Sequence, residues 1–405
     1  MEEERGVKDP LIVVQPHPVV VIPIAQAYPV FSNVRPLDVP SEWKSAISPE
    51  LWGIIQSSSL WTIRQHVKLA PKTCCSCPPC IPQENTYSIY AGLDQSNEKE
   101  IMRADEVSND CNRCCCRPYH PFRLEFRQYI PMPGDGSKSD YSHIREDVLA
   151  DLSRPGNSRQ MSLRDFYKTQ PVLLSMVRDD GMRCCYDFSE CKCLRCCVCC
   201  SCCADGVGIY AGSVPDPPLD EEGKPTGEIG RPYNLPSDRL IASVTQPIFA
   251  GWCIPTLDLR ADTNNMTDPF AKFTGPCIFG GWSEMCCDFK FFVSKHNPAA
   301  DQKLGDVALV TKKAPTTLSG AFRELASDAD VYHVAFDPEA NEKLTPSQKI
   351  AVLSGQLLSD YMLFDGQTGK CTCDDDGITC YFFYCSVIGC LWPCSLYIPY
   401  GKDKK

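Results

Sequence analysis

Short runs in which apolar and polar residues alternate recur through the chain from residue 51 onward and predict β-strands. In the clearest run, Phe122, Leu124 and Phe126 alternate with Arg123, Glu125 and Arg127. Because successive side chains of a strand point to opposite faces, we expect one buried face and one face in water here. Further β-type runs lie at residues 60–67, 86–90, 173–177, 241–248, 289–293 and 331–336. Many short strands with few helical periods between them predict a mainly β fold, either a barrel or a sandwich.

One helix is well marked after these runs. Thr345 has the place of an N-cap, Pro346 takes the first helical position, and Gln348 completes a capping box before the run KIAVLSGQLLSDYMLF. Asp365 and Gly366 end the helix. Its uncharged stretch, IAVLSGQLLS, is short, because a helix that spans a bilayer needs about 20 apolar residues. We therefore expect burial inside the protein, with a membrane span as the alternative.

The segments on either side of the β-type runs divide the chain. Residues 1–45 are rich in proline, which excludes a helix or a central strand and predicts a disordered tail. This tail is either a spacer or, through residues 10–40, a docking segment for proline-recognising modules. Two polar stretches rich in Gly and Pro, 132–160 and 213–238, predict long loops inserted between strands. The expected β-domain covers residues 46–366, and residues 367–405 form a separate C-terminal region.

Residues 378–400 (ITCYFFYCSVIGCLWPCSLYIPY) are the one long apolar run without a charge in the sequence. Its length is that of a membrane span. However, Pro393 interrupts the run, and acidic residues before it and lysines after it would place the main body outside the cytoplasm by the positive-inside rule. We expect residues 367–405 to be a cysteine-rich hydrophobic anchor that lies in the membrane interface, re-enters the bilayer, or spans it once.

Charge and cysteine content restrict the partners and the compartment. The formal net charge is −11, which disfavours nucleic acid and would repel anionic lipid unless a cation or a basic patch intervenes. There are 28 cysteines, and the N-terminal sequence MEEERGVKDP has no secretory leader pattern, so we expect a reducing, cytosolic environment.

In that environment the clustered cysteines have three interpretations, which are S-acylation, metal ligation and small apolar packing. Zinc ligation is indicated by the CxxC spacing of Cys77 and Cys80, Cys111 and Cys114, and Cys193 and Cys196. Overlapping pairs in the densest block do not define one tetrahedral site. The spacing alone leaves the three interpretations open.

Five blocks of the sequence, in the same order, resemble the phospholipid scramblase family. The first, YSIYAG followed by IMRADEVSNDCNRCCCRPYHPFRLEF, is similar to a strand, an acidic turn and a cysteine cluster that leads into a strand in that family. The others are MRCCYDFSECKCLRCCVCCSCC, FAKFTGPCIFGGWSEMCCDFKFFV, FRELASDADVYHVAF and KIAVLSGQLLSDYMLFDG. The resemblance covers about three quarters of the chain, from residue 60 to 365, and leaves out the tail, the two inserts and residues 367–405.

This resemblance implies a tubby-like barrel of about twelve antiparallel strands wrapped around a central hydrophobic C-terminal helix. A helix lined by barrel walls needs no polar face. The residues expected to mark this membrane or core helix are Ile350, Leu353, Leu357, Asp360, Tyr361 and Phe364.

The resemblance also implies two kinds of site. The matching cysteine block is S-palmitoylated in the family, which favours acylation of Cys184, Cys185, Cys193, Cys196, Cys197, Cys199, Cys200, Cys202 and Cys203. The calcium site proposed for the family aligns with Asp328, Asp330 and Glu339, with Asp337 as a further candidate. However, Tyr332, Val334 and Phe336 alternate within that segment, so a buried strand with carboxylates at its ends is the alternative.

No catalytic constellation is present in the sequence, so we expect a protein that is not an enzyme. The first hypothesis is calcium-responsive, ATP-independent, bidirectional scrambling of membrane phospholipids, with the barrel acyl-anchored on the cytoplasmic face of the plasma membrane. The alternative is a membrane-tethered barrel that binds lipids or proteins in signalling without scrambling. A zinc-binding cysteine-rich protein is the third hypothesis.

Overall fold

The computed structural model describes residues 49–66, 84–92, 98–108, 120–129, 168, 170–178, 205–216, 218, 235, 239–247, 251–261, 268–296, 305–315, 330–364, 370–373, 376–387 and 390–400. The proline-rich tail, the cysteine block at 184–203, the whole insert at 132–160 and most of the insert at 213–238 lie outside these residues.

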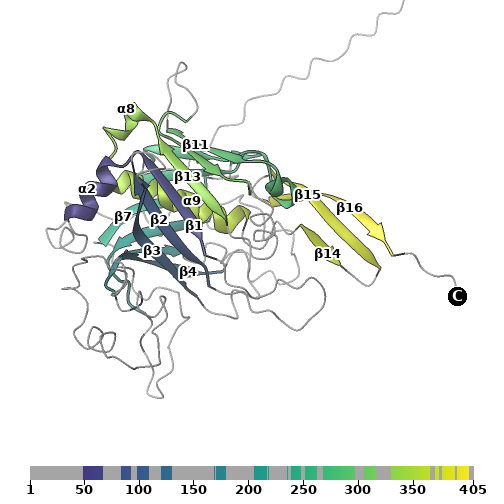
Figure 1. Ribbon diagram of the computed structural model, residues 1–405, viewed down its shortest axis with the longest axis horizontal. Coiled ribbons are helices and arrows are strands. Elements are labelled where there is room, and N and C mark those ends of the chain that lie inside the picture. The colour runs from purple at the N-terminus through teal and green to yellow at the C-terminus, as the bar shows by residue number, and fades with distance from the viewer. Residues whose placement is uncertain are drawn as a thin grey trace, which may run out of the picture.

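Twelve antiparallel strands form a closed barrel (Figure 1). Their bounds are β1 (Leu60–Gln65), β2 (Thr86–Gly92), β3 (Lys99–Val107), β4 (Phe122–Gln128), β5 (Val172–Arg178), β6 (Gly206–Ala211), β7 (Leu240–Thr245), β8 (Thr256–Ala261), β9 (Ala271–Thr274), β11 (Phe289–Lys295), β12 (Ala308–Lys312) and β13 (Val331–Phe336). Each barrel strand pairs with the next barrel strand along the chain, and β1 pairs with β13 to close the ring. The mainly β fold with twelve antiparallel strands that the sequence predicts is therefore confirmed, and every β-type run named above overlaps one of these strands.

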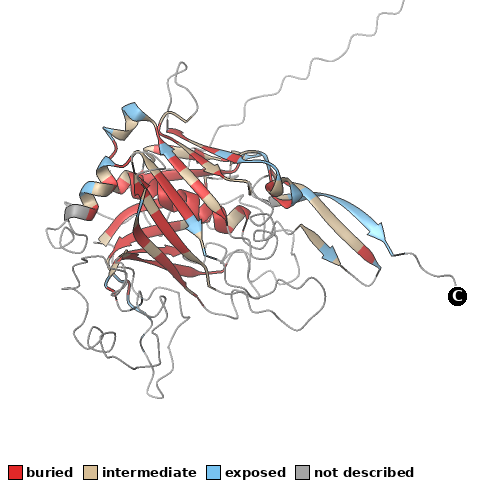
Figure 2. Cartoon of the chain, viewed as in Figure 1, coloured by how far each residue is buried: buried red, intermediate tan, exposed pale blue. Residues whose placement is uncertain are grey.

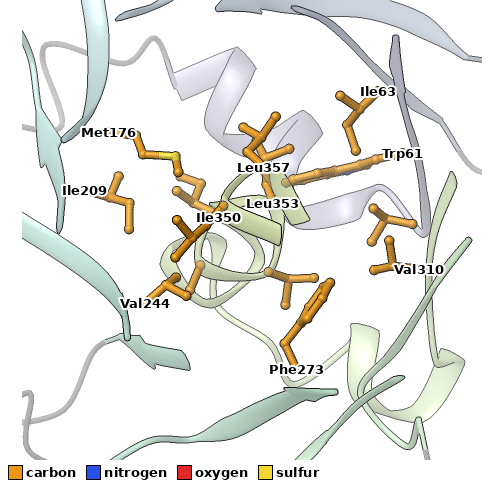
Figure 3. Close-up of a cluster of buried hydrophobic side chains, with 14 of the residues drawn as sticks. Trp61, Ile63, Met176, Ile209, Val244, Phe273, Val310, Ile350, Leu353 and Leu357 are labelled. Carbon is orange, nitrogen blue, oxygen red and sulfur yellow. The ribbon is translucent and has the colours of Figure 1, made fainter. Parts of the chain in front are cut away.

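One side chain in two from each strand points into the barrel and forms a single apolar core. Figure 3 shows part of this core, with Trp61, Met176, Val244, Phe273 and Val310 arranged around one helix. Because the ring is closed, the barrel strands leave no free edge that another chain could pair with.

The prediction that β4 has one face in water is wrong. Arg123, Glu125 and Arg127 are buried, as are the apolar residues that alternate with them (Figure 2). Arg123 donates to the carbonyl of Val214 at 3.2 Å and pairs with Asp216 at 2.8 Å, so the segment after β6 covers this side of the barrel. The alternation correctly indicates a strand, but the outer face is covered by other chain segments.

The marked helix is α9 (Pro346–Leu363), and the predicted capping box is present, with Thr345 accepting from the backbone N–H of Gln348. Fifteen of its 18 residues are buried. The described residues also contain the short helices α2 (Pro49–Ser57), α8 (Pro338–Asn341) and the 3-10 helix η7 (Gly281–Met285). The sequence pattern did not predict α2, whose Leu51 and Ile55 pack into the core from one helical turn apart.

A second, four-stranded sheet extends from one end of the barrel (Figure 1). It contains β10 (Ile278–Phe279), β14 (Cys371–Cys373), β15 (Gly377–Val387) and β16 (Cys390–Pro399). β15 and β16 form an antiparallel hairpin, and β10 and β14 pair with the other edge of β15. The apolar run at 378–400 is thus folded as two β-strands, which the expected C-terminal anchor did not anticipate.

Candidate functional site

The C-terminal half of α9 is tied to the barrel wall through a buried carboxylate. Asp360 is 1% exposed and accepts hydrogen bonds from the hydroxyls of Tyr332 at 2.6 Å and Tyr87 at 2.9 Å. Tyr332 lies on β13 and Tyr87 on β2, so one side chain of α9 bridges two separate strands. Burial, with the charge of Asp360 beside it, raises the pKa of Tyr332 well above its usual value, and the tyrosine therefore remains a donor.

The next residue of α9 makes a second buried contact. The hydroxyl of Tyr361 donates to Glu106 at 2.8 Å, and its ring stacks on Phe122 with a centroid distance of 4.0 Å. Glu106 also contacts Ser108, the backbone N–H of Asn85 and, at 3.0 Å, His120. Burial acts to raise the pKa of Glu106, but the hydrogen bond and charge of His120, with the other donors, outweigh burial and lower the pKa to about 2.

The N-terminal end of α9 is fixed by Lys349. Its ammonium group donates to the carbonyls of Gln56 at 2.5 Å and Ser58 at 2.9 Å, both at the C-terminal end of α2. Burial lowers the pKa of Lys349 to about 8. Both ends of α9 therefore have polar contacts to neighbouring elements.

The six residues expected to mark the membrane or core helix are all buried: Ile350, Leu353, Leu357, Asp360, Tyr361 and Phe364. Ile350, Leu353 and Leu357 lie among side chains of several barrel strands (Figure 3). Gly355 allows a close approach to β8, because a Cβ at this position would come 3.0 Å from the Cδ2 atom of Leu259. Within the described part of the chain, no helix combines the length and the apolar character needed to cross a bilayer.

A buried charge network lies where α9 ends and the second sheet begins. Lys312 on β12 pairs with Asp330 at 2.8 Å and Glu284 at 3.3 Å, and it lies 3.8 Å from the ring centroid of Phe364. Burial acts to lower the pKa of Lys312, but the charges of Asp330 and Glu284 outweigh burial and raise it. Lys370, just before β14, lies 3.8 Å from Glu284. The network joins the barrel, η7 and the second sheet.

The expected calcium ligands do not come together in the described residues. Asp330 precedes β13, where its carboxylate pairs with Lys312 and accepts a hydrogen bond from the hydroxyl of Tyr332. Asp337 follows the strand and caps α8 by accepting from the N–H groups of Glu339 and Ala340. A six-residue strand separates the two, about 20 Å of extended chain. Asp328 lies outside the described residues. For this segment the structure has the alternative arrangement, a buried strand with a carboxylate at each end.

The residues expected to carry palmitate, Cys184, Cys185, Cys193, Cys196, Cys197, Cys199, Cys200, Cys202 and Cys203, lie outside the described residues, as do the three CxxC pairs considered for zinc. Among the residues that are described, no group of three or more His, Cys, Asp or Glu side chains is placed to hold a metal ion.

The free cysteines of the described residues are instead gathered at one end of the molecule. They are Cys253, Cys277, Cys286, Cys287, Cys371, Cys373, Cys380, Cys385 and Cys394, and each is exposed or half-buried. Free cysteine is usually among the most buried residue types, so this distribution is unusual. Five of the nine lie on the second sheet, and the others lie on loops beside β10 and η7 or before β8.

The strand register places these thiols on a common face of the second sheet. Residues directly opposite each other in paired strands share a face, and the sulfur atoms of Cys371 and Cys380 are 3.4 Å apart. We call this face the cysteine face, and the register assigns to it Ile278, Cys371, Cys373, Ile378, Cys380, Phe383, Cys385, Val387, Trp392, Cys394, Leu396 and Ile398. Tyr384, Leu391 and Tyr381 point to the other face and pack against the barrel core. The cysteine face therefore points away from the barrel.

The exposed large apolar residues in the described part of the chain are found at the same end. They are Trp252, Ile254, Ile278, Trp282, Phe382, Trp392, Leu396, Tyr397, Ile398 and Tyr400. Trp252 is 62% exposed with φ of 64°, a conformation that bulky residues rarely adopt. Its loop leads into β8, and there the N–H of Gly275, just after β9, donates to the carbonyl of Pro255 at 2.8 Å. The run 378–400 was recognised in the sequence as apolar, but its period-2 pattern of cysteine and apolar residues is the signal that would have predicted this face.

Comparison with known proteins adds no relative to these observations. No family model matches the chain, and no match is found among curated proteins or among solved structures. The class that the structure defines is therefore a closed, twelve-stranded antiparallel β-barrel with a buried helix and an additional cysteine-rich sheet.

Proposed function

We propose that this protein is a membrane-tethered barrel that binds lipids or proteins at the cytoplasmic face of the plasma membrane and does not itself move lipids between leaflets. The tether is acylation of the cysteine block at 184–203, and the proline-rich segment 10–40 recruits proline-recognising modules. This choice favours the second of the hypotheses that the sequence raised.

The observation that carries the proposal is the placement of α9. To carry a lipid headgroup across a bilayer, a protein needs a polar track or a locally thinned membrane, because a charge in hydrocarbon costs at least several kcal/mol. The polar groups of α9 are buried in the barrel, where Asp360 accepts from Tyr87 and Tyr332 and Lys349 donates to two carbonyls. Moving α9 into a bilayer would break these contacts and expose the apolar barrel interior.

The test is a lipid-movement assay on the full-length protein purified from eukaryotic cells, so that any acylation is retained. The protein is bound to liposomes that carry a fluorescent lipid in the inner leaflet, and dithionite is added outside, with and without calcium. We expect the protein to remain with the liposomes and the quenching rate to equal that of protein-free liposomes in both conditions. Faster quenching that requires calcium would contradict the proposal and would support calcium-responsive scrambling.

A further inference from the structure

We infer that the cysteine face of the second sheet is a second membrane-contact surface, which inserts into the lipid interface independently of acylation. The inference rests on the proposed function, since it names where the folded part of a tethered barrel touches the bilayer. The ligand is the interface of a phospholipid bilayer and not a particular headgroup.

The chemical character of the face is the first argument. Every described position that the register assigns to it holds an apolar residue or a cysteine. Trp392 is 63% exposed, Leu396 52% and Ile398 49%, although they follow one another on the same side of one strand. Burial and the neighbouring thiol of Cys380 raise the pKa of Cys371, which keeps this thiol uncharged. Surfaces that bind proteins carry polar groups in a rim and in hydrogen bonds, whereas hydrocarbon needs none.

The position of the face is the second argument. The second sheet extends beyond the barrel, and β16 is exposed from Trp392 to its end (Figures 1 and 2). All the exposed large apolar residues of the described chain belong to this sheet, to η7 or to the loop around Trp252. Large exposed apolar patches are characteristic of interaction surfaces. Aromatic side chains at both ends of β16, Trp392 and Tyr400, are of the kind that concentrate in membrane interfaces.

The edge of the sheet argues against a second copy of the chain as the occupant. β16 is the outer strand, and Pro393 and Pro399 lie opposite Tyr384 and Gly377 of β15. A proline is tolerated in a strand where its missing N–H points away from the partner strand. Residues six positions apart in a strand point their backbone groups to the same edge, so the outer edge lacks two donors. This disfavours the addition of a strand from another molecule.

Charge determines how the face would bind. The formal net charge of −11 opposes attraction to anionic lipid. The N–H of Tyr400 donates to the carbonyl of Asp376, and the charges nearest to these residues in the sequence are Asp374 to Asp376 and Asp403 against Lys402, Lys404 and Lys405. Since these charges nearly cancel, we expect binding to phosphatidylcholine vesicles that changes little with salt.

The experiment uses full-length protein made in bacteria, which lack S-acylation of this kind, kept reduced and tested for flotation with phosphatidylcholine vesicles. Leu396→Glu places a charge on the cysteine face, and the matched control Ser395→Glu places the same charge on the adjacent exposed position, which faces the other way. We expect Leu396→Glu to weaken vesicle binding by tenfold or more and Ser395→Glu to change it by less than about twofold.

A second readout locates the contact directly. Vesicles that contain phosphatidylcholine brominated in its acyl chains quench tryptophans that reach the hydrocarbon. We expect quenching in the wild type and a smaller quenched fraction in Trp392→Phe, whereas the fully buried Trp61 contributes none. Equal quenching in the two proteins would overturn the inference.

The outcomes separate this inference from the proposed function. If bacterial protein fails to float, or if both glutamate variants bind equally well, the cysteine face is not a membrane-contact surface. The proposed function then still stands if protein from eukaryotic cells fractionates with membranes and stays there. If sedimentation shows that the wild type self-associates and Leu396→Glu is monomeric, the face joins two copies of the chain and the inference is wrong.

Discussion

At the scale of single residues, the barrel depends on buried ionisable groups that have hydrogen-bond or ion-pair partners. Glu106, Asp360 and Lys312 are each nearly inaccessible, and each contacts groups from two or more elements. The contact partners of these residues could not be identified from the sequence, because they are far apart along the chain. Asp360 and Tyr87, for example, are separated by 273 positions. An isolated buried charge would be strongly unfavourable, so these partners determine whether the fold is stable.

Glu106→Gln should make stability respond differently to acid. The pKa of Glu106 is about 2 in the folded protein against 4.5 for the free side chain, so the ionised form stabilises the fold above pH 4.5 and this contribution is lost as pH falls toward 2. We expect the variant to be less stable by roughly 3 kcal/mol at pH 7, at about 1.4 kcal/mol per unit of pKa, and the difference to shrink in acid. Urea unfolding at a series of pH values measures it.

The control for this experiment is Glu339→Gln, which removes an exposed carboxylate in the first turn of α8. That change should alter the free energy of unfolding by less than about 1 kcal/mol at any pH. A difference between Glu106→Gln and the wild type that is the same at pH 7 and near pH 2.5 would contradict the assigned role of Glu106.

The neighbouring lysines 312 and 313 offer a matched pair. Lys312→Met removes the cation between Asp330 and Glu284 and leaves two buried carboxylates without it, which should cost about 3–5 kcal/mol. Lys313→Met removes a pairing with Asp288 in which both side chains are more than one third exposed, and should cost less than about 1 kcal/mol. Denaturant unfolding measures both variants. If Lys312→Met and Lys313→Met lose similar amounts of unfolding free energy, the buried network around Lys312 does not stabilise the fold more than the exposed pair does.

At the scale of secondary-structure elements, α9 shows which features can be predicted from local sequence signals. Its capping box, first-turn proline and length were all predictable, because these signals are local. The β4 strand was predictable for the same reason, but its buried outer face was not, since burial there depends on the segment after β6. The hairpin at 378–400 was missed because its cysteines and aromatic residues gave a continuous apolar run that matched a membrane segment in length.

The contact at Gly355 makes a prediction about how tightly the barrel holds α9. A branched side chain in Gly355→Val would collide with Leu259 and Phe273, which should lower the free energy of unfolding by about 1–3 kcal/mol. The control is Gly53→Val in α2, where an added Cβ meets nothing within 4 Å, and the expected change is within about 0.5 kcal/mol. Thermal unfolding of both variants compares them, and equal stability of the two would mean that α9 is loosely packed.

At the scale of the whole molecule, the structure has two very different surfaces. The barrel wall is closed, and charged residues of β4 and β12 are buried in it, whereas the end with η7, β10 and the second sheet presents cysteines and aromatic residues. The short alternating runs predicted a barrel or a sandwich, and the choice of a twelve-stranded barrel came from the resemblance to phospholipid scramblases. The convergence of Trp252, Trp282 and Trp392 at one end could not, because it depends on the pairing of β10 with β15.

The proposed function requires that α9 stays inside the barrel when the protein is on a membrane. Hydrogen–deuterium exchange of the backbone amides of residues 346–363, compared between free and liposome-bound protein, tests it most directly. We predict slow exchange in α9 in both states. We also predict that the barrel strands around α9 are protected equally in the free and the liposome-bound protein. Loss of protection in β1, β7 and β8 on liposome binding, with altered exchange in α9, would mean that the helix leaves the barrel and would contradict the account.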